Sequence, residues 1–185
     1  MPTDQEGIED KHLFFGYMGM RDKIFSLGKG WNVWLPSRND LDIYDQYDAE
    51  YIVAQNMMGE VVGGARFIRT DRGGANPAAG QYTYMIRDAQ RGLLNGLPDD
   101  LCENPPCSSR VWELTRFVTN GQGYARDVLM ESCLKFLKDR RAKSFIFLGP
   151  QGFKVMARRF GYQLNPLGPL SRNKDGQFQV FLCNI

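Results

Sequence analysis

Hydrophobic and polar positions alternate along the chain in two periods, and each change of period marks a predicted element. Helical spacing predicts helices over residues 11–26, 84–94 and 124–141, and one over 151–160 that Gly161 ends. Alternation and short apolar runs predict strands over residues 51–55, 60–68, 111–118, 144–148 and 177–183, the first two joined as a hairpin. A hairpin followed by strand, helix, strand, helix and strand favours an α/β or α+β fold with a partly antiparallel sheet.

Two details refine this picture. In the helix over residues 124–141 we expect Val128, Leu129, Leu134 and Leu137 to face the core. Residues 28–48 break the periodicity with aromatic and polar residues, which predicts a long ordered loop of the kind that is often functional. The length of 185 residues fits a single domain spanning residues 1–185.

Composition excludes several classes of protein. With 43% hydrophobic residues the chain is globular, and a net charge of +2 is too small to indicate a nucleic-acid partner. The polar, acidic start from Met1 to Gly7 is unlike a secretory signal, and no apolar run approaches the length of a bilayer span. We therefore expect a cytoplasmic protein with no membrane partner.

Cysteine and histidine argue against two kinds of site. The irregularly spaced Cys102, Cys107, Cys133 and Cys183 are expected to be reduced thiols, and no metal site is expected because His12 is the only histidine and lies far from them. A nucleophilic Ser–His or Cys–His pair would have to use His12 as its base, which disfavours that chemistry.

Opposite charges interrupt the strand predicted over residues 111–118. In a regular strand Glu113 shares a face with Thr115 and Phe117, whereas Arg116 points to the other face. If Glu113 and Arg116 serve one site, the strand must be bulged between them. The alternative is a structural ion pair with neighbours on each face.

Other charged residues also lie in apolar surroundings. Arg21 falls on the apolar stripe of the first helix, either at its rim with the head in water or buried and aimed at carboxylates. Cations and anions that are costly to bury singly can compensate one another in one network. The candidate members are Arg21, Arg66, Arg116, Asp42, Asp45 and Glu113.

The order and spacing of eight residues resemble a known family. These residues are Arg21, Phe25, Trp31, Asp42, Asp45, Arg66, Glu113 and Arg116, the last two within Trp112-Glu113-Leu114-Thr115-Arg116-Phe117. The pattern is similar to that of the N-acyl-homoserine-lactone synthases, the bacterial autoinducer synthases of quorum sensing. The resemblance runs from about residue 13 to about residue 120 and is loose beyond.

The resemblance implies a fold and a reaction. The fold would be GNAT-like, related to the acyl-CoA N-acetyltransferases, with a mixed, largely antiparallel sheet, helices on both sides and a V-shaped cleft. The enzyme would be an acyltransferase that takes S-adenosylmethionine as a substrate and an acyl thioester on acyl carrier protein or coenzyme A, and releases methylthioadenosine. No metal and no bound cofactor are implied.

The reaction assigns roles to the candidate residues. Because an α-amine with a pKa near roughly 8 is largely protonated at neutral pH, a base is needed, and Glu113 is the candidate. Burial would raise its pKa and a neighbouring arginine would lower it. By resemblance, Arg21, Phe25 and Trp31 enclose the donor, with Trp34 as a rival for Trp31, and Asp42, Asp45, Arg66 and Arg116 hold the loop and the cleft together.

The acyl side is less specific. The strand after Glu113, with Thr115, Phe117, Val118 and Thr119, is a candidate ladder for a pantetheine arm. Five apolar residues could line an acyl pocket or belong to the core: Met130, Phe145, Phe147, Phe153 and Met156. The second half of the chain is locally basic, which fits either binding of an acidic carrier protein or a helix face in solvent. The basic residues are Lys135, Lys138, Arg140, Arg141, Lys143, Lys154, Arg158 and Arg159. Leu148-Gly149-Pro150 stands where many members carry a hydroxyl thought to favour 3-oxo chains, so that preference is not indicated.

Two other functions fit parts of the pattern. An N-acyltransferase that uses acyl-CoA and another amine would share the fold but would release no methylthioadenosine. A binding module that has lost activity would keep a pocket without turnover.

Overall fold

The computed structural model describes residues 4–27, 41–45, 48–72 and 82–185. Its helices are α1 (Asp4–Arg21), which continues as the π-helical segment η1 (Asp22–Leu27), α2 (Met85–Gln90), α3 (Gly123–Asp139) and α4 (Phe153–Arg159). Its strands are β1 (Glu50–Gln55), β2 (Val61–Arg69), β3 (Val111–Thr119), β4 (Ser144–Pro150), β5 (Leu164–Pro166), β6 (Ser171–Asn173) and β7 (Gly176–Asn184).

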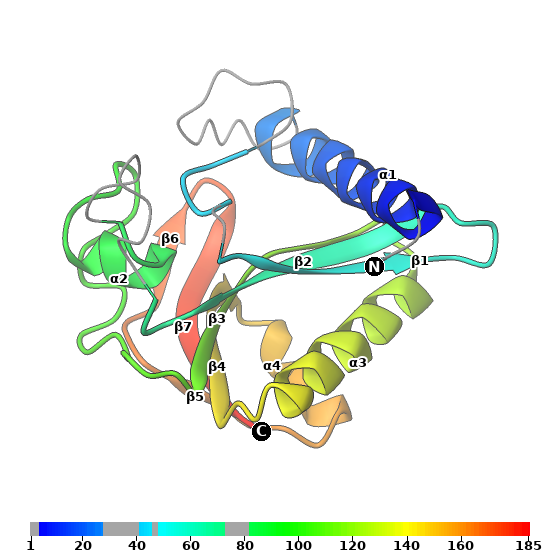
Figure 1. Cartoon of the computed structure of the whole chain (residues 1–185). Helices are drawn as coiled ribbons and strands as arrows, with labels where there is room; N and C mark the ends of the chain where they lie inside the picture. Colours follow the sequence, from blue (N-terminus) through cyan, green and yellow to red (C-terminus); the bar gives the residue numbers. More distant parts are fainter. Residues whose placement is uncertain (1–3, 28–40, 46–47, 73–81) are drawn as a thin grey trace.

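The strands form one sheet in the order β1-β2-β3-β4-β7-β5, with β6 paired to β7. Only the β3–β4 pair is parallel, and its register stops at Glu113 opposite Ile146 although both strands continue. Beyond that point the two halves of the sheet run in different directions (Figure 1). The predicted mixed, largely antiparallel sheet is therefore confirmed, and it opens where β3 leaves β4.

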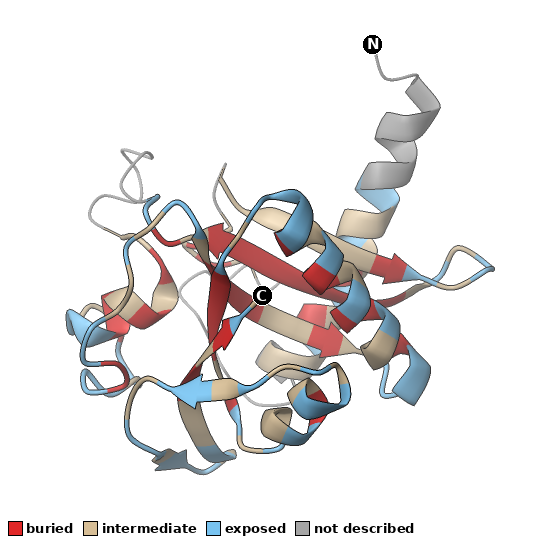
Figure 2. Ribbon diagram, turned by 90° about the horizontal axis from the view of Figure 1, so that it is seen from below, coloured by how far each residue is buried: buried red, intermediate tan, exposed pale blue. Residues whose placement is uncertain are grey.

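Helices cover both faces of the sheet. On one face α1 packs Tyr17 and Met18 against Val118 of β3, and on the other α3 packs in the core that contains Leu114 (Figure 1). A Cβ at Gly64 would overlap the ring of Tyr17, so glycine is required where α1 approaches β2. Buried residues follow the strands and exposed ones lie on the outer sides of the helices (Figure 2).

The predicted elements are recovered with four differences. The first helix begins at Asp4 rather than near residue 11. The short β5 and β6 were missed, because three residues carry too little periodicity to be recognised. The helix predicted over residues 84–94 is confined to α2. Val128 is 46% exposed, so its predicted inward position is wrong, because the buried stripe of α3 runs through Leu129, Leu134 and Leu137 and leaves Val128 to one side.

No helix within the described residues has the length and apolar character needed to cross a membrane. The single domain predicted over residues 1–185 stays a prediction, which the one continuous sheet supports.

Candidate active site

Strand β3 carries the predicted bulge. Gly64 pairs with Val118 and Arg66 pairs with Thr115, so two residues of β3 lie opposite one residue of β2. The extra residue is at Arg116, whose φ of 53° lies in the left-handed region that non-glycine residues seldom adopt. A bulge was predicted between Glu113 and Arg116 if both serve one site, and the structure has the bulge at Arg116, at the end of that interval.

The bulge changes which face of the sheet Arg116 reaches. Thr115 Oγ1 accepts a hydrogen bond from Arg66 Nε at 3.0 Å, and Arg116 Nη2 lies 2.8 Å from Asp42 Oδ2. Asp42 is also bound by Arg66, so Thr115 and Arg116 face the same side although they are adjacent in sequence. A regular strand would have sent one of them to the opposite face.

Three arginines and two aspartates form a buried cluster, which we call the arginine–aspartate cluster. Its members are Arg21, Arg66, Arg116, Asp42 and Asp45. Arg66 binds Asp42 with both terminal nitrogens, at 2.6 and 3.2 Å, and Arg21 binds Asp45 in the same two-pronged way at 2.8 and 2.9 Å. Arg66 Nη1 also lies 2.8 Å from Asp45 Oδ1, which joins the two pairs.

Burial and charge act oppositely on the aspartates of the cluster. Burial is the largest single influence and would raise the pKa of Asp42 and Asp45. The arginines together outweigh it, Arg66 with Arg116 at Asp42 and Arg66 with Arg21 at Asp45, so both pKa values are lowered. The carboxylates therefore stay ionised, and the cluster holds segment 41–45 to α1, β2 and β3.

Arg21 is fully buried, so the alternative in which it lies at the rim of the helix with its head in water is wrong. Arg116 Cζ lies 4.8 Å from the centre of the Phe25 ring, so Phe25 is next to the cluster. Trp31 and Trp34, the two candidates for the donor sulfonium, lie outside the described residues.

Glu113 is held by backbone amides rather than by arginines. Its side chain is fully buried, and its two oxygens accept hydrogen bonds from the amides of Met85 and Ile86 at 3.0 and 2.8 Å. These amides begin α2 and would otherwise lack a partner. The expectation that Glu113 joins the ion network is wrong: it shares a face with Arg66 but binds α2 instead.

The surroundings of Glu113 suit a base at neutral pH. Burial raises its pKa to about 7, and the two amides and Arg66 limit the rise. A carboxyl whose pKa lies near the working pH takes and returns a proton readily.

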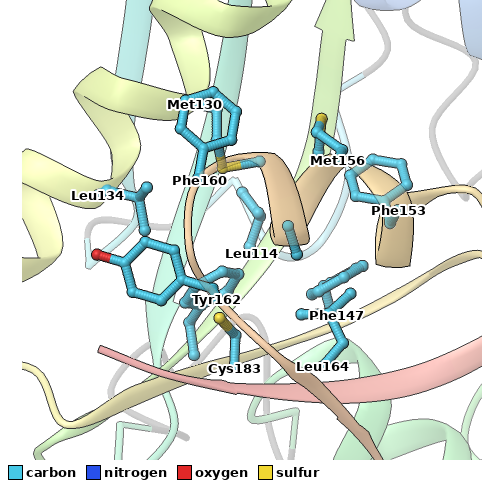
Figure 3. Close-up of a pocket in the computed structure, with 12 residues that line it drawn as sticks. Leu114, Met130, Leu134, Phe147, Phe153, Met156, Phe160, Tyr162, Leu164 and Cys183 are labelled. Atoms are coloured by element: carbon cyan, nitrogen blue, oxygen red, sulfur yellow. The ribbon is translucent and has the colours of Figure 1, made fainter.

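An apolar cavity lies on the opposite face of the sheet, between α3 and α4 (Figure 3). Leu114 of β3 forms part of its wall. The five residues expected to line either an acyl pocket or the core all line the cavity: Met130, Phe145, Phe147, Phe153 and Met156. The remaining lining residues are Leu134, Ala157, Phe160, Tyr162, Leu164 and Cys183. Its volume is only ≈ 20 Å³, about the room that one water needs, so a bound chain requires these side chains to move.

The strand residues proposed to pair with a pantetheine arm, from Thr115 to Thr119, already have partners for their side chains. Thr115 is bound to Arg66, Val118 packs against α1, Thr119 pairs with Gly63, and the Phe117 ring lies 6.0 Å from that of Phe153. No described strand pairs with the β4 side of β3 beyond Glu113. Only backbone groups along that edge remain to meet an arm.

The basic residues of the second half are mostly exposed and partly paired. Lys135 binds Asp139 at 2.7 Å, Arg140 binds Glu50 at 2.8 Å, and Arg159 binds Asp127 at 3.2 Å. Surface pairs of this kind contribute little to stability and exchange partners easily.

Two tyrosines of the site were missed. Tyr51 donates its hydroxyl to Asp45 at 2.8 Å, and the buried Tyr44 donates to Asp88 at 3.0 Å. In sequence a tyrosine on a strand or among aromatics reads as core, and only the need of a buried hydroxyl for a partner could have signalled these contacts. No three metal-ligating side chains come together among the described residues, and all four cysteines are free thiols.

Comparison with known proteins gives a consistent result. No protein-family model matches the sequence. An acyl-homoserine-lactone synthase of Acinetobacter nosocomialis is 28% identical over 185 residues, covering 94% of this chain and 91% of that protein. One of Pseudomonas aeruginosa is 27% identical and covers 86% of this chain and 76% of that protein. Over most of its length, the chain is similar to curated acyl-homoserine-lactone synthases.

Solved structures agree with the predicted fold. The CoA-dependent acyl-homoserine-lactone synthase BjaI, with S-adenosylmethionine and isopentyl-CoA, has a TM-score of 0.76 at 19% identity and covers 98% of this chain and 79% of its own. Outside the synthases, an acyl-CoA N-acyltransferase from Pseudomonas aeruginosa has a TM-score of 0.55 at 10% identity, covering 93% of this chain and 90% of its own. The predicted GNAT-like fold is thereby confirmed.

Proposed function

We propose that this chain joins S-adenosylmethionine to an acyl thioester and closes the product to an acyl-homoserine lactone, a quorum-sensing signal. The observation that carries the proposal is Glu113. It is buried, has a pKa of about 7 and lies on the same face of the sheet as the arginine–aspartate cluster, in a chain whose relatives are synthases of this kind.

The first step forms the amide. Glu113, directly or through a water, takes a proton from the ammonium of S-adenosylmethionine, and the amine nitrogen attacks the thioester carbonyl. The C–S bond breaks, and the thiol leaves with a second proton from the nitrogen. Where β3 separates from β4, the unpaired edge of β3 would hold the pantetheine arm beside Glu113.

The second step closes the ring. The carboxylate of the donor attacks the carbon next to the sulfonium, a C–O bond forms, and methylthioadenosine leaves as a neutral thioether. This step needs orientation more than acid or base. Over both steps one proton is released to solvent.

The remaining candidates bind and orient. Arg21 and Phe25, with Trp31 or Trp34, would enclose the donor. The cluster would hold segment 41–45 beside the donor, since its charges tie that segment to three elements of the fold.

The acyl chain would pass to the other face, into the cavity behind Leu114. An acyl carrier protein, being acidic, would meet the exposed lysines and arginines of α3 and α4. Coenzyme A would bring its phosphates to the same charges. We propose either carrier as donor, no cofactor, and a cytoplasmic location as the sequence predicts.

One assay tests the reaction. The purified protein is incubated with S-adenosylmethionine and a panel of acyl thioesters on carrier protein and on coenzyme A, and products are read by mass spectrometry. Lactone and methylthioadenosine in equal amounts support the proposal. Acyl transfer to another amine without methylthioadenosine would support the alternative, an N-acyltransferase, and no turnover with any thioester would contradict both.

A further inference from the structure

Asp88 of α2 is a buried carboxylate outside the set of eight residues that carry the family resemblance. It is fully buried and accepts hydrogen bonds from four donors. These are the Tyr44 hydroxyl at 3.0 Å, the Thr83 amide at 2.7 Å, the Thr83 hydroxyl at 2.8 Å and Arg91 Nη1 at 3.3 Å. A carboxylate so buried and so fully bonded fixes the backbone around it.

The backbone that Asp88 fixes is the one that holds Glu113. Thr83 directly precedes the N-cap of α2, and the next two amides after that N-cap, of Met85 and Ile86, bind the Glu113 oxygens. Asp88 therefore fixes the residue before the N-cap of α2, while Glu113 binds the first amides of the helix.

Tyr44 connects the same carboxylate to the arginine–aspartate cluster. The amide of Tyr44 donates to Asp42 Oδ1 at 2.8 Å, and its hydroxyl donates to Asp88 Oδ2. The Tyr44 ring also lies 5.8 Å from Arg66 Cζ. A continuous series of contacts thus runs from Asp42 through Tyr44 and Asp88 to the amides at Glu113.

We propose that Asp88, tied to Tyr44, is a positioning residue for the amide-forming step: it aims the amides of α2 at Glu113 and keeps a second negative charge beside that carboxyl. The proposal rests on the proposed function for its kinetic consequence. The charge of Asp88 opposes that of Glu113, whereas Arg66 on β2 favours it. The other titratable groups facing Glu113 are the phenols of Tyr44 and Tyr84.

Two variants separate the charge of Asp88 from its hydrogen bond. Asp88→Asn removes the charge and keeps one oxygen that accepts from Tyr44, whereas Tyr44→Phe removes that hydrogen bond and leaves the charge. We expect kcat to fall about tenfold in each, with the KM for S-adenosylmethionine within about twofold of wild type, because a small misplacement of a reacting group slows the step more than binding. The double variant should lose less than the product of the two single losses, since Asp88→Asn weakens the charge-assisted hydrogen bond that Tyr44→Phe removes.

The pH profile distinguishes positioning from a purely structural role. In Asp88→Asn the acid limb of kcat/KM should move to lower pH by about half a unit or more, because a like charge beside the base has gone. In Tyr44→Phe it should not move down. Asp139→Asn and Tyr124→Phe, on the exposed side of α3, are the matched controls and should change neither quantity.

An unmoved acid limb in Asp88→Asn, or losses of kcat that simply multiply in the double variant, would overturn the proposal. Failure of the proposed function is seen separately, as a wild type that makes no lactone from any thioester. In that case the carboxyl of Glu113 is titrated by carbon-13 NMR, its signal assigned by its loss in Glu113→Gln. The inference then stands if Asp88→Asn lowers the titration midpoint and fails if it does not.

Discussion

Arg116 reaches Asp42, 74 positions earlier in the chain, with Nε at 3.2 Å and Nη2 at 2.8 Å from the same carboxylate oxygen. It does so from a backbone conformation with φ of 53° that costs about 1 kcal/mol or more for a residue with a side chain. Two charge-assisted hydrogen bonds in a buried site outweigh that amount. The bulge of β3 and the position of segment 41–45 are therefore coupled through one ion pair.

Arg116→Ala should lower the free energy of unfolding by about 3 kcal/mol, because it leaves the buried Asp42 with one cation fewer. Urea unfolding measures the change. Arg126→Ala is the control: the ion pair of Arg126 with Asp127 is on the surface, and its loss should change stability by about 0.5 kcal/mol or less. Arg116→Gly removes the same ion pair without backbone strain, so a glycine variant as stable as wild type would show that the ion pair is not what matters.

Glu113→Gln should abolish amide formation while leaving a folded protein. The amide side chain still accepts one hydrogen bond from α2 but takes no proton, so kcat should fall about a hundredfold or more. Methylthioadenosine release measures turnover and circular dichroism measures folding. Near-normal turnover would remove Glu113 from the role of base.

Stability should peak in mildly acidic solution, because folding lowers the pKa of two buried carboxyls and raises the pKa of a third. The lowered pKa values of Asp42 and Asp45 add stability above their ordinary value of 3.8, and that stability is lost as the pH falls below it. The raised pKa of Glu113 does the reverse. Its contribution is complete below the ordinary value of 4.5 and is lost as the pH rises through about 7.

Glu113→Gln therefore changes the slope of stability against pH. Wild type should lose on the order of 3 kcal/mol between pH 4.5 and pH 8 from this residue, and the variant should lose none of it, since glutamine does not titrate. Urea unfolding at a series of pH values compares the two proteins. Parallel curves over this range would show that folding does not raise the pKa of Glu113.

Much of the site was predictable because its residues break the apolar pattern around them. Arg21 on a helix stripe and Arg116 in a strand are each too costly to bury singly, which predicted both the cluster and the bulge. The partner of Glu113 was not predictable. It depends on where α2 packs, and the helical spacing over residues 84–94 predicts a helix without predicting what that helix contacts.

The cavity shows a different limit of sequence reasoning. All five residues suggested for it line it, but the same residues would fit any core. What sets them apart is the separation of β3 from β4, which follows from the length of their pairing. Strand pairing is a long-range property that the pattern of one chain does not specify.

Arg21→Lys should weaken the binding of S-adenosylmethionine more than it slows turnover. Lysine cannot bind both oxygens of Asp45 as Arg21 does, so the donor side of the cluster loosens. We expect the KM for S-adenosylmethionine to rise on the order of tenfold. An unchanged saturation curve would count against a role of Arg21 on the donor side.

Met156→Ala should shift the acyl preference toward longer chains. Met156 of α4 lines the cavity, and its removal adds room for about two methylenes in a space that now fits about one water. Since one methylene is worth about 1–3 kcal/mol in a hydrophobic pocket, the ratio of long-chain to short-chain lactone should rise about tenfold or more. Met18→Ala makes the same substitution on the opposite face of the sheet and should lose comparable stability without changing the ratio. Mass spectrometry of products from mixed thioesters measures both ratios, and equal shifts in the two variants would mean that the chain does not enter this cavity.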